Sequence, residues 1–391
     1  MGYILVYLFL LVSPPFVFQL FPGVPSWQVL YIIIFPLLIL YAIIHKLSLL
    51  RNEVRMMGII WIFGWALFFV LHQDSIYLSR IAMAGISIVV LSVILSLGIK
   101  KFCKVYIYII TAMAIAGTIM FFAVYFLGLS PIFGYENVDG KPGYCFGLTC
   151  TNAYLDYVNV FRYSGFFDEP GSMGLWGLYA ILLNKLLFDN RKIELILILC
   201  LVFTFSIGFY VSIAVYLFLF YFNLRNKRML LGLVVLFIGI SSFIATNERF
   251  YNMTVGRLTY DKSTGTIAGN NRDVQQKNAT KYFFENPLFG VGANNAVIMA
   301  EKGVDINDNV MSPFAKDGLV GAFLIYFPFI SLLFKRHKNK TARNCLWVFL
   351  LTFFHRAVVF TVYNIVLYIV LLMIINSVSK YKIKKYELYG R

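Results

Sequence analysis

The most chemically suggestive residues of this 391-residue chain are arginines that lie outside its apolar segments. A guanidinium group offers planar, paired N–H donors that match the oxygens of a phosphate or diphosphate. An enzyme that transfers a group from a diphosphate needs such donors to stabilise the charge of the leaving group. The alternative for any single arginine is an ion pair with a nearby carboxylate, or a side chain whose stem packs on apolar surface. The arginines of this kind are Arg162, Arg249, Arg257, Arg272 and Arg356.

One set of polar and aromatic residues follows Arg162 in the stretch Arg-Tyr-Ser-Gly-Phe-Phe-Asp-Glu-Pro-Gly, which ends at Gly171. Asp168 and Glu169 supply carboxylates that can accept a hydrogen bond from a hydroxyl group, and Glu169 is a candidate proton acceptor. Aromatic residues such as Tyr163 lie among them, and aromatic rings with a few polar groups are typical of a ligand site. The stretch favours a sugar ligand, and an aromatic belt at a membrane interface is an alternative of equal weight.

A second polar stretch surrounds Arg272. Asn271 is a typical helix cap, and the helix that it starts should end before Pro287, because the residue before a proline avoids the helical conformation. Arg272, Lys277 and Lys281 then share a broad polar face, since residues four apart are neighbours on a helix. Such a basic face suits the oxygens of a phosphate group.

A glycine-bearing turn and further polar residues complete the second stretch. Leu-Phe-Gly-Val-Gly at 288–292 lets backbone approach a ligand closely, and its spacing excludes a nucleotide P-loop. Asp308 is a second candidate proton acceptor beside Glu169. No spacing of Cys and His residues suggests a metal site, and no cofactor is expected. The expected catalytic residues are Arg162, Arg272, Glu169 and Asp308, and the expected substrate contacts are Arg257, Asp168, Lys281, Asn309, Tyr163 and Arg356.

Long apolar segments must position these residues. The chain is 60% hydrophobic and 13% charged, whereas soluble domains carry about 25% charged residues. A bilayer core needs about 20 apolar residues per helix, and helices satisfy their own backbone hydrogen bonds. We expect an all-α, polytopic membrane protein, with one transmembrane domain over residues 1–391 and no cleaved signal peptide. The twelve expected spans are 3–21, 27–45, 57–71, 81–98, 105–127, 172–188, 193–206, 207–223, 229–246, 312–334, 344–354 and 357–379.

The formal charge of +16 is distributed unevenly over the loops between these spans. When alternate loops are assigned to opposite sides, one side holds 22 of the 34 Lys and Arg residues but only four of the 18 Asp and Glu residues. By the positive-inside rule this side is cytoplasmic, and both termini lie there. Residues 193–223 are divided at Ser206 because the charge rule then holds. The basic residues are therefore topology signals and contacts for anionic lipid, and not a nucleic-acid footprint.

Two long loops, residues 128–171 and 247–311, face outward and carry most of the outward charges. Long ordered loops in a compact protein are usually functional. In the first loop, Cys145 and Cys150 are expected to form a disulfide in an oxidising compartment, with two free thiols as the alternative. Asn152 is expected to cap a short helix. The scarcity of charge in the centres of the spans argues against an ion-coupled transporter.

Several stretches of the chain resemble the O-antigen polymerase (Wzy) and O-antigen ligase family of bacterial polysaccharide assembly, and the span count and two large outward loops match that family too. The resemblance implies a metal-independent glycosyltransferase of the GT-C type in the bacterial inner membrane. Polymerase members move a growing glycan from undecaprenyl diphosphate to the terminal sugar of another lipid-linked repeat unit, and ligase members move the finished glycan to lipid A-core. The matching stretches are 162–171, 204–208, Arg272, 286–292 and 317–321.

The resemblance also implies roles for individual residues. Arginines in the two outward loops are the family's characteristic functional residues, so Arg162 and Arg272 are expected to clamp the donor diphosphate. Glu169 or Asp308 is expected to accept the proton of the acceptor hydroxyl or to orient the sugar. The chain departs from the family where many members, ligases especially, have a His-Asn pair, because Asp308 and Asn309 occupy that place. This departure favours a polymerase over a ligase and leaves the chain without the family's histidine base.

Three other functions stay open at this point. They are a ligase of the same family, a flippase for lipid-linked oligosaccharides, and a structural or regulatory membrane subunit. A flippase needs a central charged cavity and alternating access, whereas the polar residues of this chain gather at one face, which favours the polymerase. The expected partners are the lipid-linked donor and acceptor glycans, membrane lipid and a chain-length regulator.

Overall fold

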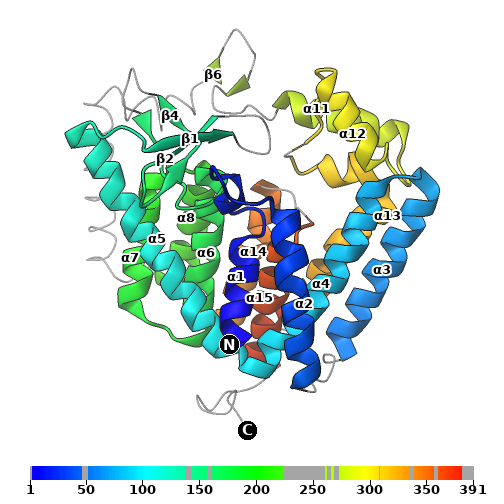
Figure 1. The fold of residues 1–391 in the computed structure, drawn as a ribbon, viewed down its shortest axis with the longest axis horizontal. Helices are drawn as coiled ribbons and strands as arrows, with labels where there is room; N and C mark the ends of the chain where they lie inside the picture. The colour runs from blue at the N-terminus through cyan, green and yellow to red at the C-terminus, as the bar shows by residue number, and fades with distance from the viewer. Residues whose placement is uncertain are drawn as a thin grey trace.

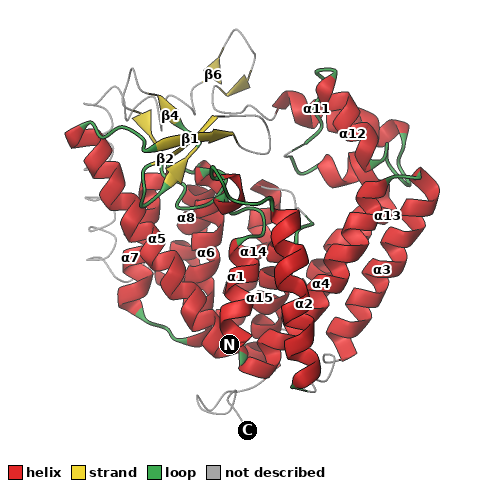
Figure 2. Ribbon diagram, in the orientation of Figure 1, coloured by secondary structure: helices red, strands yellow, loops and turns green. Residues whose placement is uncertain are grey.

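The structure is a computed structural model, and helices make up most of the residues that it describes (Figure 2). Three helices in this part of the chain are long and apolar enough to cross a membrane, namely Arg55–His72, Ser75–Leu97 and Ile99–Leu127. They support a mainly helical membrane protein, and the count of twelve spans stays a prediction. The described residues are 2–45, 52–136, 142–155, 160–222, 260–261, 266–267, 273–307, 309–333, 339–355 and 360–380.

The described helices follow the expected spans closely. Eleven of the twelve expected spans contain a helix, and the remaining one, 229–246, lies outside the described residues. Two further helices, α11 and α12, lie in the second loop, outside the expected spans. The helices are α1 Gly2–Leu11, α2 Trp27–Ile44, α3 Asn52–His72, α4 Ser75–Leu97, α5 Ile99–Leu127, α6 Pro170–Leu187, α7 Arg191–Leu201, α8 Ile207–Tyr221, α11 Asp273–Glu285, α12 Ala293–Glu301, α13 Ser312–Leu333, α14 Lys340–His355 and α15 Val362–Lys380, with short 3-10 turns η1 Phe18–Leu20 and η3 Val202–Thr204.

The first expected span is too long, and the fourth begins too late. α1 ends at Leu11, because the prolines at 14 and 15 lack the N–H group that a helix needs and clash with its preceding turn. α4 begins at Ser75, six residues before the expected start. Asp74 caps it, with its side chain accepting a hydrogen bond from the backbone N–H of Ile76 at 2.8 Å. Arg80 therefore lies inside this helix and not in a loop.

The division of residues 193–223 is confirmed. α7 ends in η3, Phe205 adopts a left-handed conformation, and α8 follows, with Ser206 as its N-cap. The hydroxyls of Tyr216 and Tyr221, late in α8, both donate to Glu194 at the start of α7, each at 2.6 Å. The two helices therefore run in opposite directions, and the turn between them lies at the end of the bundle away from Glu194.

The first loop contains small antiparallel sheets, while the described part of the chain is mostly helical and fits the all-α expectation. The short helix expected after Asn152 is wrong, because β4 and β5 form a hairpin there. Tyr, Phe and Val are enriched in this region and favour strands. The strands of the first loop are β1 Phe133–Glu136, β2 Pro142–Cys145 and β3 Cys150–Thr151 in one sheet, and β4 Tyr154–Leu155 with β5 Val160–Phe161 in another. In the second loop, β6 Tyr260–Asp261 pairs with β7 Thr266–Ile267.

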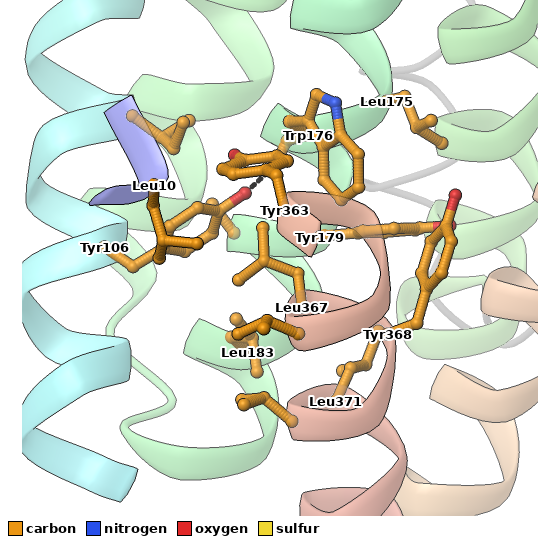
Figure 3. Close-up of a cluster of buried hydrophobic side chains, with 14 of the residues drawn as sticks. Leu10, Tyr106, Leu175, Trp176, Tyr179, Leu183, Tyr363, Leu367, Tyr368 and Leu371 are labelled. Atoms are coloured by element: carbon orange, nitrogen blue, oxygen red, sulfur yellow. Dashed lines mark hydrogen bonds between the residues drawn. The ribbon is translucent and has the colours of Figure 1, made fainter. Parts of the chain in front are cut away.

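α6 is the central helix of the bundle. Its residues from Pro170 are buried almost without interruption, and Figure 3 shows its Trp176 and Tyr179 packed among Tyr363 and Tyr368 of α15. The hydroxyl of Tyr106 on α5 donates to the backbone carbonyl of Trp176 at 3.1 Å. The residues that enter α6 are thus held by a helix that is buried along most of its length.

The two loops lie at the same end of the bundle. Figure 1 shows the strands of the first loop and the α11–α12 pair above the helices, and the start of α1 at the opposite end. The start of α1 lies beside the expected cytoplasmic lysines, because Lys101 covers the ring of Tyr3 at 5.1 Å. Lys100 similarly covers the ring of Phe188, just after α6, at 5.5 Å. The expected basic side and the loops therefore occupy opposite ends of the described fold.

Candidate functional site

The stretch that carries Arg162 and the two carboxylates is fixed on both sides. Ser164 donates to the carbonyl of Cys150 on β3, from its backbone N–H at 2.9 Å and from its hydroxyl at 2.7 Å. The N–H of Asp168 donates to the carbonyl of Pro15 at 2.9 Å, which ties the stretch to the segment after α1. The chain between 162 and 169 is therefore rigidly held when it enters α6.

Arg162 binds the turn between α7 and α8. Its Nε donates to the carbonyl of Thr204 at 3.2 Å, and its Nη2 donates to the carbonyl of Phe205 at 3.0 Å. These carbonyls end the helical run of α7 and η3, where the helix dipole favours a positive charge. The half-buried guanidinium thus joins two stretches that carry the family resemblance, 162–171 and 204–208.

Asp168 and Glu169 stand at the start of α6. Glu169 is the N-cap residue, Pro170 occupies the first turn, and the hydroxyl of Ser172 donates to the Asp168 carboxylate. The positive end of the helix dipole favours negative charge at both positions. Both side chains are half-buried. The fold therefore presents an adjacent pair of carboxylates at the loop end of the central helix α6.

Tyr163 is a core residue in this structure. Its side chain is fully buried, and its hydroxyl donates to the carbonyl of Cys200 at 2.7 Å. Its ring lies against Gly117 of α5, where a Cβ atom would come within 2.3 Å of it. Tyr163 thus joins α5, the first loop and α7, and its expected contact with substrate stays a prediction.

Asn309 is likewise a structural residue. It is 3% exposed. Its side-chain N–H groups donate to the carbonyls of Ile306 and Asn307 at 3.2 and 2.9 Å, and its side-chain oxygen accepts from the N–H of Met311 at 2.9 Å. The amide is therefore used in shaping the turn before α13, and its expected role in substrate binding stays a prediction.

Lys281 is exposed on α11. That helix ends at Glu285, before Pro287 as the sequence predicts, and its described part begins at Asp273, two residues after the expected cap Asn271. Lys281 lies 4.0 Å from Glu285 one turn later, an exposed pair of little energetic weight. Four other expected site residues fall outside the part of the chain that the structure describes: Arg257, Arg272, Asp308 and Arg356.

The glycine turn at 286–292 packs against the start of α13. The N–H of Gly292 donates to the carbonyl of Lys316 at 2.9 Å, and the N–H of Leu319 donates to the carbonyl of Pro287 at 2.8 Å. Gly318 has φ of 64°, and a Cβ atom there would lie 2.3 Å from the backbone carbonyl of Leu288. The backbone of 286–292 thus lies in close contact with the backbone of 317–321.

An ion pair that the sequence reading missed lies beneath this turn. Asp317, 1% exposed at its side chain, pairs with Arg80 of α4 at 2.8 Å and accepts from the hydroxyl of Tyr77 at 2.9 Å. The guanidinium lies 4.5 Å from the ring centroid of Trp65 and 5.0 Å from that of Tyr77. Ionisable residues in apolar segments signal such a site, but Arg80 was placed just outside the fourth expected span.

The same group of residues caps α12. The N–H of Ala293 donates to the hydroxyl of Tyr77 at 3.2 Å, and the N–H of Asn294 donates to the carboxylate of Asp74 at 2.6 Å. The first N–H groups of a helix have no hydrogen-bond partner within the helix itself, and a negative side chain is favourable beside them. The α3–α4 corner therefore holds the second loop in place.

Cys145 and Cys150 are free cysteines, so the expected disulfide is not present in this structure. They lie directly opposite one another on β2 and β3. The hydrogen bond from the Cys150 thiol lowers the pKa of Cys145 to about 6, although burial opposes this shift. The same contact, together with burial, raises the pKa of Cys150. Cys145 is therefore the more acidic thiol of the two.

Comparisons with known proteins assign no family to this chain. No protein-family model matches it, and no curated protein matches it. No group of three or more His, Cys, Asp or Glu side chains suited to a metal ion occurs among the described residues. The site must therefore be interpreted from its own geometry and from the resemblance of its short stretches.

Proposed function

We propose that this protein is a polysaccharide polymerase of the O-antigen type. It joins oligosaccharide repeat units carried on undecaprenyl diphosphate at the outer face of the bacterial inner membrane, with both termini in the cytoplasm. One observation carries the proposal: the stretches that resemble the family meet in two pairs at the loop end of the bundle. Arg162 binds the turn that opens 204–208, and 286–292 binds 317–321.

The pairing bears on mechanism because electrostatic catalysis requires donors that are in place before the reaction. Hydrogen bonds to Thr204 and Phe205 fix the guanidinium of Arg162 in this way. In the proposal Arg162 and Arg272 stabilise the diphosphate as it leaves the donor sugar. Glu169 and Asp308 are the carboxylates that the sequence offers as proton acceptors. Arg257, Asp168, Lys281 and Arg356 are the remaining proposed substrate contacts, and no metal is required.

A strain that lacks the gene tests this proposal. The surface glycan of such a strain should carry single repeat units, and the wild-type gene should restore a ladder of long chains. Arg162→Ala and Arg272→Ala should leave single units while the protein is still present in the membrane. Arg191→Ala is the matched control, because Arg191 starts α7 at the opposite end of the bundle and should restore the full ladder. A normal ladder from Arg272→Ala would contradict the clamp.

The flippase is the second candidate, and the buried Arg80–Asp317 pair favours it, because transporters keep ionisable groups in apolar helices. The position of the pair weighs against it. Arg80 lies near the start of α4 and Asp317 near the start of α13, both at the loop end. Loss of all surface glycan in the deletion strain, in place of single units, would indicate the flippase or the ligase.

A further inference from the structure

One face of α5 is exposed along most of the helix. From Lys104 onward the exposed positions recur every three or four residues, which places them in one stripe on the helix. They are Tyr108, Ala112, Ile115, Ile119, Phe122 and Phe126. Because α5 is long and apolar enough to cross a membrane, this stripe is the part of the helix that a bilayer covers.

The exposed apolar surface continues beyond α5 into the first loop. Leu127, the last residue of the helix, is 74% exposed, and Ile132, just before β1, is 71% exposed. Leu148, in the turn between β2 and β3, is 52% exposed. A Cβ atom at Gly147 would lie 3.1 Å from Cδ1 of Ile132, so this turn and Ile132 are adjacent. Together with the exposed Leu129, these three side chains form what we call the loop patch.

The length of α5 places the loop patch at the level of the lipid headgroups. The helix has 29 residues, which at the rise of an α-helix measure about 44 Å. The apolar core of a bilayer is about 30 Å thick, and the bilayer with its headgroup regions about 40–45 Å. No charged residue occurs between Lys104, near the basic end of α5, and Glu136. Figure 1 shows the loop end of α5 at the outer edge of the bundle, beside the sheet of the first loop.

Lipid fits the loop patch better than a protein partner does. Exposed apolar patches of this kind mark contacts with a protein or with a membrane. An interface with a protein has an apolar centre that is surrounded by a polar rim. The loop patch instead runs directly into the stripe of α5, with no charged residue between them. This continuity with a surface that the bilayer covers favours lipid as the occupant.

The sheet of the first loop connects the loop patch to the Arg162 stretch. The N–H of Ile132 donates to the carbonyl of Cys145 on β2 at 2.8 Å. Tyr144, the preceding residue of β2, pairs with Thr151 of β3. The hydroxyl of Thr151 donates to the carbonyl of Arg162 at 2.6 Å. A contact that fixes the depth of the loop patch in the membrane therefore also fixes the depth of Arg162.

We propose that the loop patch inserts into the lipid leaflet on the loop side of the membrane and holds the first loop at the level of the headgroups. Its apolar side chains enter the boundary between headgroups and acyl chains, where burial of apolar surface is favourable. The contact itself does not depend on the reaction proposed above. In the proposed polymerase it sets Arg162 at the depth of a lipid-borne diphosphate, and this consequence rests on the proposed function.

Photo-crosslinking in lipid nanodiscs tests the contact. The photoreactive residue p-benzoylphenylalanine replaces Ile132 or Leu148 in the full-length protein, and the nanodiscs contain phosphatidylethanolamine and phosphatidylglycerol. After irradiation, the mass of the intact protein should increase by that of one phospholipid at both positions. Phe126 is the positive control, because it belongs to the stripe of α5. Glu136 is the negative control, because it is exposed at the far end of β1 and should give no lipid adduct.

Three outcomes overturn the contact. The first is the absence of a lipid adduct from either folded variant while position 126 gives one, and the second is an adduct with another protein chain. The third is an equal yield of lipid adduct at position 136. Leu129, also in the loop patch, takes the place of a position whose variant does not fold. Lipid adducts from a protein that shows no polymerisation would refute the proposed function and leave the membrane contact intact.

Discussion

Arg80 and Asp317, 237 residues apart in the sequence, form an ion pair 2.8 Å long between α4 and α13. The carboxylate is buried, and the guanidinium is covered by the rings of Trp65 and Tyr77. A buried pair contributes little net stability when it is intact, but removal of one partner leaves an uncompensated charge. The pair therefore fixes the position of the start of α13, and of the second-loop turn that packs on it, relative to α4.

We predict that Asp317→Ala destabilises the protein by about 3–5 kcal/mol, because it leaves the Arg80 cation without its partner. Thermal unfolding in detergent measures this change. Glu285→Ala is the matched control, since it removes the partner of Lys281 from an exposed pair, where the effect should stay below about 1 kcal/mol. Equal decreases in the unfolding temperature of the two variants would show that the buried pair contributes no more to stability than the exposed one.

Substitution of Gly318 should disrupt the contact between the two glycine-bearing stretches. A Cβ atom in Gly318→Ala would lie 2.3 Å from the Leu288 carbonyl, so the backbone must move. Gly303→Ala is the control, because Gly303 also has positive φ but has no atom within 4 Å of such a Cβ. The control should cost about 1–2 kcal/mol from its backbone conformation alone. Folded yield after purification should separate the two, and a normal yield of Gly318→Ala would contradict the close packing.

Arg162→Lys should weaken the junction between the first loop and the α7–α8 turn. A lysine has no planar fork with which to reach the carbonyls of both Thr204 and Phe205. We expect a loss of about 1–3 kcal/mol in stability and at least tenfold lower polymerisation, measured side by side. Arg191→Lys serves for comparison at the opposite end of the bundle. Full activity and stability of Arg162→Lys would refute the importance of the paired hydrogen bonds.

Tyr163→Phe distinguishes a core residue from a sugar contact. The variant removes one hydrogen bond, to the carbonyl of Cys200, so stability should fall by about 1 kcal/mol. The KM for the lipid-linked substrate should stay at its wild-type value, because the side chain is buried. A KM raised severalfold, with unchanged stability, would restore the role in substrate binding that the sequence suggested.

Local patterns predicted the elements of the fold better than their contacts. Apolar segments located the helices, the charge rule divided the chain at Ser206, and cap and proline signals placed α11 within two residues at its start and at its observed end. The same signals, applied to Pro14 and Pro15, would have shortened α1. The sequence patterns did not predict the hairpins of the first loop, because their strands are only two to four residues long.

The site shows the limit of such reasoning. Asp168 and Glu169 could be placed at a helix start from the proline that follows them, and they are found there. Nothing local to Arg162 indicates that its guanidinium binds carbonyls 42 and 43 residues away. Similarly, Tyr163 and Asn309 have the composition of ligand-binding residues, and only the packing around them shows that the fold itself uses both.

Reconstitution gives the most direct test of the central claim, that this protein polymerises lipid-linked repeat units. The purified full-length protein in lipid nanodiscs is incubated with undecaprenyl-diphosphate repeat units from the deletion strain, and the products are sized by mass spectrometry. The account predicts a series of lipid-linked glycans that differ by whole repeat units, with undecaprenyl diphosphate released in equal number to the bonds formed. Recovery of the single repeat unit alone, from folded protein, would contradict it.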